Sequence, residues 1–395
     1  MRYVIIGASA AGINAAKTLR ETDSECEIVL ISKDENVYSR CMLHLYISGE
    51  RNLDSLSFIE NDFFDKNKIT WLKGLSVMQI NDTLKTLELS NNKTLSYDKL
   101  LIASGASAFI PPVKNLREAT NVFPLRNIED AISIAKRYKY GDNVVIIGGG
   151  LVGIDAAIGL IHKSANIHLV EMADRILPLQ LDKTASSKYE NLLLKNNVKL
   201  YLNSSAKEVI LNEKGEAATL ALSDGTEISC DLVIVAAGVR PNIDFIKDTQ
   251  IKTDRGILID NTCKTNIDDI FSAGDVTALS PIWPVAARQG KCAALNMLGK
   301  ETTCDDTFAY LNSMNFLGLE SVSIGTIEAP DNTYSTEIYE TKNIYKKIIH
   351  KNGIIYGALL QGDISYCGVL CNLIKNKINI SHLNKSIFKI NSADF

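Results

Sequence analysis

The chain lacks the features that indicate a nucleic-acid, metal or zinc-finger protein. Its formal net charge is −4 at pH 7, so it has no basic excess with which to attract nucleic acid. Its eight cysteines include no CxxC pair, so the sequence predicts neither a zinc site nor a vicinal dithiol, and we expect no metal. Scattered, reduced cysteines are typical of the cytoplasm, where we expect this protein to be located.

Long uninterrupted apolar runs are also missing. Residues 144–161 are almost wholly apolar, but three adjacent glycines and Asp155 interrupt them, which is typical of a buried strand, turn and helix. The opening MRYVIIGASAAGINAAK has an arginine before an apolar run, as a signal peptide does. Its glycine spacing is better explained by a nucleotide-binding turn. Because neither this segment nor residues 144–161 is typical of a membrane segment, we expect no membrane partner.

A glycine-rich turn occurs twice. The sequence reads VIIGASAAG at residues 4–12 and VIIGGGLVG at residues 145–153. Each copy has a β-branched run, a glycine turn and a helical stretch, the order in which a strand presents a helix N-terminus to a pyrophosphate. One such motif is weak evidence, but a duplicate with the same preceding strand predicts two dinucleotide sites.

The length and the turn pattern predict three domains. With 395 residues, 46% of them hydrophobic, the chain can bury more than one core. We expect an α/β protein with two Rossmann-like βαβ dinucleotide-binding domains, the second inserted in the first, plus a C-terminal α+β domain. The expected boundaries are residues 1–112 and 238–300 for the first domain, 113–237 for the second and 301–395 for the third.

The motif order identifies a family resemblance. GASAAG, ASG, GGGLVG, the strand-end Glu171, AAGVRPN and FSAGD follow one another as in the FAD-dependent pyridine nucleotide-disulfide oxidoreductase superfamily. Within it, the chain looks most like NADH:rubredoxin oxidoreductases and the flavin region of nitrite reductases. The resemblance implies FAD in the first domain and NADH in the inserted one. It also implies that Asp275 holds the ribityl chain and that the helix after Trp283 points its positive end at the flavin.

The resemblance assigns cofactor contacts to the two glycine turns and to the segments that approach them. Ser9 replaces the usual middle glycine of the first turn, and Ser32 stands where an acid for the adenosine ribose is usual. The assigned residues are Gly7, Ser9, Ala10, Ala11, Gly12, Ser32, Lys33, Arg40, Val77, Ser104, Gly105, Arg126, Gly148, Gly150, Leu151, Val152, Gly153, Glu171, Gly238, Asp275 and Ala287.

Glu171 predicts the choice of coenzyme. It ends the strand IHLVE, 171 − 153 = 18 residues after Gly153. A carboxylate at this position accepts hydrogen bonds from the adenosine 2′-hydroxyl and repels a 2′-phosphate. We therefore expect NADH rather than NADPH. The alternative is a solvated glutamate at a strand end.

Residues 36–50, NVYSRCMLHLYISGE, leave two alternatives for the second half-reaction. Cys41 stands where coenzyme A-disulfide reductases and NADH oxidases or peroxidases have a redox-active thiol, which a helix N-terminus and Arg40 could activate. The YSR opening looks more like rubredoxin reductases, in which Cys41 would be a small apolar filler near the flavin.

Asp155 and the helix after Cys41 raise a related question. The family often has a glutamate near the nicotinamide–flavin contact at the position of Asp155, although an acid in the first helical turn is also favoured by the helix dipole. A lysine commonly pairs with that acid, but Leu45 takes its place here. We expect His44 to be a hydrogen-bonded structural histidine.

These observations predict an NADH-dependent FAD oxidoreductase that passes electrons to a small iron–sulfur protein, rubredoxin or a ferredoxin. One alternative is reduction of a disulfide, polysulfide, peroxide or oxygen through Cys41. Another is a flavin-binding docking subunit of a redox complex. We expect a monomer or homodimer. Cys367 and Cys371 are four residues apart and are read as buried small residues rather than a redox pair.

Overall fold

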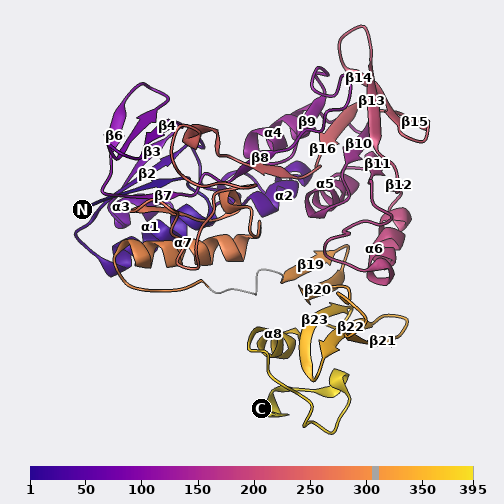
Figure 1. The fold of residues 1–395 in the computed structure, drawn as a ribbon. Coiled ribbons are helices and arrows are strands. Elements are labelled where there is room, and N and C mark those ends of the chain that lie inside the picture. Colours follow the sequence, from indigo (N-terminus) through magenta and orange to yellow (C-terminus); the bar gives the residue numbers. More distant parts are fainter. Residues whose placement is uncertain (305–310, 395) are drawn as a thin grey trace. The chain divides into compact units, whose positions relative to one another are not determined.

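The computed structural model describes residues 1–304 and 311–394, which form two compact units (Figure 1). The first unit comprises the described parts of 1–42, 51–108 and 239–306, and the second those of 43–50, 109–238 and 307–395. No helix among the described residues is long and apolar enough to cross a membrane. The cytoplasmic location stays a prediction.

A five-stranded parallel sheet forms the centre of the first unit. Its innermost strand is the buried run RYVII, in which Val4 pairs with Val29 on one side and Leu100 on the other. Strands buried on both faces are continuous apolar runs, as here. In spatial order the strands are β18 (Ile270–Ser272), β7 (Lys99–Ile102), β1 (Arg2–Ile6), β2 (Glu27–Ser32) and β3 (Ile69–Lys73).

Two helices pack together on this sheet. α1 (Ala10–Thr22) and α7 (Trp283–Met297) lie side by side, as the indigo and orange helices of Figure 1 show. A Cβ at Gly290 would lie 2.1 Å from the Ala11 carbonyl oxygen, so only glycine allows this close contact. The shorter elements of the unit are η1 (Arg40–Met42), η2 (Asp54–Leu56), α3 (Phe63–Lys66), β4 (Val77–Asn81), β5 (Thr86–Leu89), β6 (Thr94–Ser96), β8 (Ala106–Ala108), β17 (Val239–Pro241), η3 (Asp244–Ile246) and η4 (Asp275–Thr277).

The second unit repeats the same architecture. Its parallel sheet has the order β12 (Lys199–Tyr201), β11 (Asn166–Val170), β10 (Asn143–Ile147), β16 (Leu232–Val235) and β9 (Val122–Pro124). The helices are α2 (Leu43–Ser48), α4 (Ile128–Arg137), α5 (Leu151–Ile161) and α6 (Lys183–Lys195), and a hairpin sheet contains β13 (Ala206–Leu211), β14 (Ala217–Leu222) and β15 (Glu227–Ser229). The short helix α2 packs against α4 and α5.

The C-terminal part of the second unit is an antiparallel sheet covered by a helix. The sheet has the order β19 (Asn312–Phe316), β20 (Leu319–Gly325), β23 (Ile354–Gln361), β22 (Tyr345–Lys351) and β21 (Ser335–Glu340). α8 (Cys367–Lys375), η6 (Ile387–Lys389) and η7 (Ser392–Asp394) complete it.

A buried polar cluster joins this part to α6. The Tyr345 hydroxyl donates to Asp182 at 2.6 Å and the Lys347 ammonium at 3.1 Å, while the Tyr189 hydroxyl donates to the Leu319 carbonyl at 2.6 Å. Together with the two parallel sheets, this antiparallel sheet and its helix confirm the predicted fold class. The exact domain boundaries stay a prediction.

Candidate dinucleotide-binding and redox site

The first glycine turn, between β1 and α1, is shaped by close backbone contact. Gly7 has a φ of +112°, and a Cβ there would lie 2.1 Å from the Ala103 carbonyl oxygen. A Cβ at Gly12 would lie 1.8 Å from the Gly7 carbonyl oxygen. Only glycine meets these demands. The helix N-terminus is thereby held directly against the end of β1, where an anion would meet its free N–H groups.

The second turn, between β10 and α5, reproduces this geometry. Gly148 has a φ of +113°, and a Cβ there would lie 2.4 Å from the Ala236 carbonyl oxygen. A Cβ at Gly153 would lie 1.9 Å from the Gly148 carbonyl oxygen. Gly150 is the N-cap of α5, and Leu151 and Val152 are its first residues. The sequence repeat is therefore a repeat of backbone structure.

Ser9 occupies the N-cap position of α1 with extended backbone, and its side chain makes no capping hydrogen bond. Ser9 is half-exposed at the helix N-terminus, where its hydroxyl can act as a donor to a phosphate. Ala10 and Ala11 begin the helix and are buried. The substitution of the middle glycine therefore leaves a usable phosphate cradle.

Ser32, at the end of β2, is already engaged within the protein. Its hydroxyl accepts a 2.8 Å hydrogen bond from the Trp71 indole and donates at 2.7 Å to the Asp34 carbonyl. Lys33 next to it is exposed. The side chain of Val77, on β4, is buried in the core beneath the sheet. Contacts of these residues with the adenosine end of FAD stay predictions, and those of Val77 would have to use its backbone.

Arg40 is a partly buried arginine of the first unit. Its guanidinium contacts Asp34 at 2.5 Å and lies 4.9 Å from the centre of the Tyr38 ring. Burial disfavours its charge, but attraction to Tyr38, Asp34 and Asp275 outweighs burial and raises the Arg40 pKa. A permanent cation thus interacts with both Asp34 and Asp275, a relationship that the sequence did not indicate.

Asp275 is the third residue after the end of β18, in the segment FSAGD. The Gly274 N–H before it donates at 2.8 Å to the buried Gln289 side chain of α7, and Thr277 donates at 2.9 Å to the Gly274 carbonyl. These bonds hold the backbone of the turn that contains Asp275 against α7. Ala287 is a buried residue near the start of the same helix. Pro284 at the helix start leaves no N–H there to be satisfied.

The turn after β7 is held by two hydrogen bonds to Asn242. The sequence alone did not indicate this residue. The Ser104 hydroxyl donates at 2.9 Å to the Asn242 carbonyl, and the Asn242 amide returns a 2.9 Å bond to the Ser104 carbonyl. Gly105 and Gly238 both have positive φ, of +67° and +101°. The asparagine of the AAGVRPN motif therefore holds the small-residue turn in shape.

Glu171 lies at the second glycine turn, as the sequence predicted for an acid at the end of β11. Its carboxylate accepts the Gly149 N–H at 2.6 Å and the Ala173 N–H at 2.8 Å. A Cβ at Gly149 would lie 3.1 Å from the Glu171 Cβ. The carboxylate is thus positioned by the backbone beside the turn, and contact with the coenzyme ribose stays a prediction.

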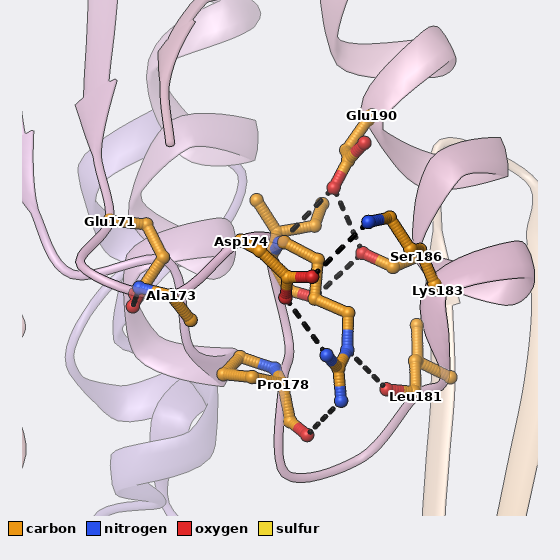
Figure 2. A network of polar contacts seen from close by, with 10 residues as sticks. Glu171, Ala173, Asp174, Pro178, Leu181, Lys183, Ser186 and Glu190 are labelled. Carbon is orange, nitrogen blue, oxygen red and sulfur yellow. Dashed lines mark hydrogen bonds and ion pairs between the residues drawn. The ribbon is translucent and has the colours of Figure 1, made fainter. Parts of the chain in front are cut away.

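Arg175, in the loop after Glu171, is engaged by groups of that loop. The Arg175 guanidinium pairs with Asp174 at 2.9 Å and donates to the Leu181 and Pro178 carbonyls at 3.1 and 3.4 Å. Figure 2 shows Asp174, Pro178 and Leu181 in this network of polar contacts. Lys183 also contacts Asp174, at 3.4 Å. Because Arg175 is already engaged by Asp174 and two backbone carbonyls, it is not available to bind a 2′-phosphate. A 2′-phosphate beside Glu171 would instead be repelled by the carboxylate.

Asp155, on α5, has His44 of α2 as its neighbour. Their Oδ1 and Nδ1 atoms are 3.7 Å apart, and their side chains are 25% and 18% exposed. A Cβ at Gly159 would lie 2.7 Å from the His44 carbonyl oxygen, so the two helices are in close contact. Burial raises the pKa of Asp155 to about 7. Leu45 stands where the family commonly has a lysine that pairs with this acid. In this chain His44, the residue before it, is the neighbour of Asp155 instead.

Arg126 and Cys41 complete the assigned residues. Arg126 lies one residue before Asn127, the N-cap of α4, and its backbone N–H donates to Asp130 at 2.9 Å. Cys41 is exposed within η1, directly before α2. Because α2 has only six residues, its dipole is weak. The contacts of both residues with cofactors stay predictions.

These features fit two dinucleotides. Each parallel sheet has a glycine turn leading into a helix, and each has an acid nearby, Asp275 in one case and Glu171 in the other. Amide N–H groups at helix N-termini bind phosphates, and carboxylates accept from sugar hydroxyls. The geometry can therefore hold FAD in the first unit and a nicotinamide dinucleotide in the second.

The chain belongs to the pyridine nucleotide-disulphide oxidoreductase family, whose model matches residues 1–290. Residues 311–378 match the rubredoxin NAD+ reductase C-terminal domain. The family includes NADH-dependent flavin oxidoreductases, which use FAD and NADH. The predicted family and cofactors are confirmed.

Three relatives illustrate the range of the family. The chain is 29% identical to the NADH-rubredoxin oxidoreductase of Clostridium acetobutylicum, covering 100% of this chain and 97% of that one. The solved structure of that enzyme has a TM-score of 0.80 and covers 97% of both chains at 28% identity. An NADH oxidase of Methanocaldococcus jannaschii is 32% identical over 76% of this chain and 71% of its own length.

The third relative is the NADH-dependent phenylglyoxylate dehydrogenase subunit epsilon of Aromatoleum evansii, which is 27% identical over 97% of this chain and 93% of its own length. Other curated relatives are longer. The chain spans 51% of an assimilatory nitrate reductase electron transfer subunit of Bacillus subtilis.

Proposed function

We propose that the protein oxidises NADH and delivers the electrons through FAD to a small iron–sulfur protein such as rubredoxin or a ferredoxin. The observation that carries this proposal is the C-terminal match to the rubredoxin NAD+ reductase domain over residues 311–378. FAD, when bound, can accept a hydride and release electrons one at a time. The protein holds the cofactors, excludes water and leaves an acceptor access to the flavin.

The residues of this chain divide that task. The turns at Gly7 and Gly148 hold the two pyrophosphates, and Asp275 accepts hydrogen bonds from the ribityl hydroxyls. Glu171 accepts from the coenzyme ribose. Arg40 balances the charge of Asp34 and Asp275, which keeps the cradle from repelling an anionic cofactor.

Direct electron transfer is favoured by the surroundings of Cys41. The thiol precedes a helix of only six residues, and the neighbouring Arg40 guanidinium is 2.5 Å from Asp34. Both features weaken the support that a reactive thiolate needs. We therefore give Cys41 no covalent role.

A second candidate is reduction of oxygen, peroxide or a disulfide through Cys41. Its support is the exposure of the Cys41 thiol and the 32% identity to an NADH oxidase. A third is a flavin-binding subunit that transfers electrons within a larger complex, which the match to the subunit epsilon supports. Whether the chain is a monomer or a homodimer stays a prediction.

The test is a steady-state screen of the FAD-loaded protein with NADH and one acceptor at a time: rubredoxin, ferredoxin, coenzyme A disulfide, hydrogen peroxide and oxygen. We expect the highest kcat/KM with an iron–sulfur protein. A higher value with peroxide, oxygen or disulfide would replace the proposal by the second candidate. Rapid flavin bleaching by NADH without turnover of any acceptor would favour the third.

A further inference from the structure

Three cysteines that are distant in the sequence meet in the first unit. Cys263 lies in the turn before β18, Cys292 is on α7, and Cys304 follows that helix. The Cys292 thiol donates at 3.3 Å to the Thr302 carbonyl, two residues before Cys304, and at 3.8 Å to the Asn261 carbonyl, two residues before Cys263. The three thiols therefore lie close enough to interact with one another. Cys263 and Cys292 are buried, at 1% and 4% exposure, whereas Cys304 is partly exposed. The cluster thus has two inner thiols and one that solvent can reach.

The three segments are held together by hydrogen bonds of their own. The Asn296 amide donates to the Thr302 carbonyl at 2.7 Å and to the Thr262 carbonyl at 3.1 Å. The Cys304 N–H donates to the Asn261 carbonyl at 2.6 Å. Asn296 thus links α7 to the segments that contain the other two cysteines. The three segments that carry the thiols are therefore fixed relative to one another by hydrogen bonds.

The cluster is separate from the dinucleotide site. Cys292 is 292 − 283 = 9 residues after the first residue of α7, which at about 1.5 Å per residue is roughly 13 Å along the helix. The described residues include no group of three or more histidine, cysteine or acidic side chains arranged to hold a metal ion. We therefore consider thiol oxidation.

We propose that Cys304, Cys292 and Cys263 form a peroxide-reactive thiol cluster in which Cys304 is oxidised first and Cys292 then captures it as an intramolecular disulfide. In the first step the Cys304 sulfur attacks hydrogen peroxide, the O–O bond breaks, and a sulfenic acid and water are formed. In the second step the Cys292 sulfur attacks the Cys304 sulfur, the S–O bond breaks and water leaves. Two thiols and one peroxide yield one disulfide and two waters.

Cys263 is a positioning residue in this scheme. Its hydrogen bond to the Cys292 sulfur lowers the Cys292 pKa, although contact with Cys304 and burial raise the pKa more, to about 11. The pKa of Cys263 itself is raised further, by hydrogen bonds with the other two thiols and by burial. Cys292 is the inner thiol that contacts the Cys304 segment directly, since it donates to the Thr302 carbonyl at 3.3 Å, and we therefore assign the bridge to it.

Trypsin separates the three cysteines, because lysine or arginine residues divide them into peptides 256–264, 292–300 and 301–342. The FAD-loaded, reduced protein is exposed to hydrogen peroxide, alkylated and digested, and the peptides are measured by mass spectrometry. We expect peptide 292–300 linked to 301–342 at the summed mass less two hydrogens, reversed by dithiothreitol. With dimedone present, the adduct should appear on Cys304.

Variants make the assignment specific. Cys304→Ser should leave Cys292 reduced, while the control Cys371→Ser, at a cysteine on α8, should leave the bridge unchanged. Cys263→Ala should slow bridge formation by about tenfold, and Cys263→Ser, which keeps a donor, should restore it. Flavin absorbance shows that each variant is folded.

Two results would overturn the proposal. One is a wild-type protein in which Cys304 stays reduced or advances to sulfinic acid without a bridge. The other is a bridge that joins peptide 301–342 to 256–264, because it would exclude Cys292 as the partner of Cys304.

Discussion

His44 Nδ1 lies 3.7 Å from Asp155 Oδ1, and this pair joins α2 to the helix that begins at the second glycine turn. Burial raises the pKa of Asp155 to about 7. The carboxylate therefore changes its charge within the physiological pH range, which an ordinary aspartate does not.

The first prediction follows from this pKa. Oxidation of NADH gives the nicotinamide ring a positive charge, which a nearby carboxylate stabilises as it develops. Because Asp155 is neutral below its pKa and charged above it, flavin reduction by NADH should become faster as pH rises through about 7. Asp155→Asn should abolish this dependence and lower the rate at pH 8 by about tenfold, or ~1.4 kcal/mol.

The measurement is stopped-flow bleaching of the flavin between pH 5.5 and 8.5. Asp224→Asn removes an acid from a surface turn and should keep the wild-type profile. His44→Gln should retain the pH dependence with a shifted midpoint, since Asp155 remains. An unchanged profile in Asp155→Asn would show that this carboxylate does not act on the nicotinamide.

The second prediction concerns Glu171 and the coenzyme. The wild-type protein should prefer NADH, because the carboxylate accepts two backbone N–H bonds at the turn and would repel a 2′-phosphate. Glu171→Ala together with Met172→Arg should shift the ratio of kcat/KM values toward NADPH by about 10–100-fold, or ~1.4–2.8 kcal/mol. A kcat/KM that already favours NADPH in the wild type would contradict this assignment.

The features that could be predicted from the sequence are local ones. The two turns and Glu171 depend on residues that are neighbours in the chain, since glycine spacing and a strand end determine their geometry. The remaining contacts need distant segments to meet. The hydrogen-bonded pair Ser104 and Asn242 is separated by 138 residues in the sequence. The pattern of apolar residues along a chain does not indicate contacts between such distant residues. The three-thiol cluster was missed for the same reason, because its cysteines have no motif spacing.

The third prediction concerns retention of FAD. Asp275 lies in a turn whose backbone is held by the bond between Gly274 and Gln289, and its carboxylate should accept hydrogen bonds from the ribityl hydroxyls. Asp275→Ala should therefore be purified largely without flavin. Asp268→Ala, which removes an exposed acid of the preceding loop, is the matched control and should retain FAD. Full occupancy of Asp275→Ala by absorbance would place the ribityl site elsewhere.

The last prediction separates the two uses of Cys41. If electrons pass directly from the flavin to an iron–sulfur protein, Cys41→Ser should keep most of the NADH-dependent acceptor reduction. If the thiol carries electrons, the same change should lower turnover of disulfide or peroxide by about two orders of magnitude or more, because a hydroxyl is a poor substitute for a thiolate near neutral pH. Anaerobic titration gives an independent measurement. Direct transfer requires one NADH per FAD, whereas an oxidised Cys41 requires a second, so a two-equivalent titration that falls to one in Cys41→Ser would establish the thiol mechanism.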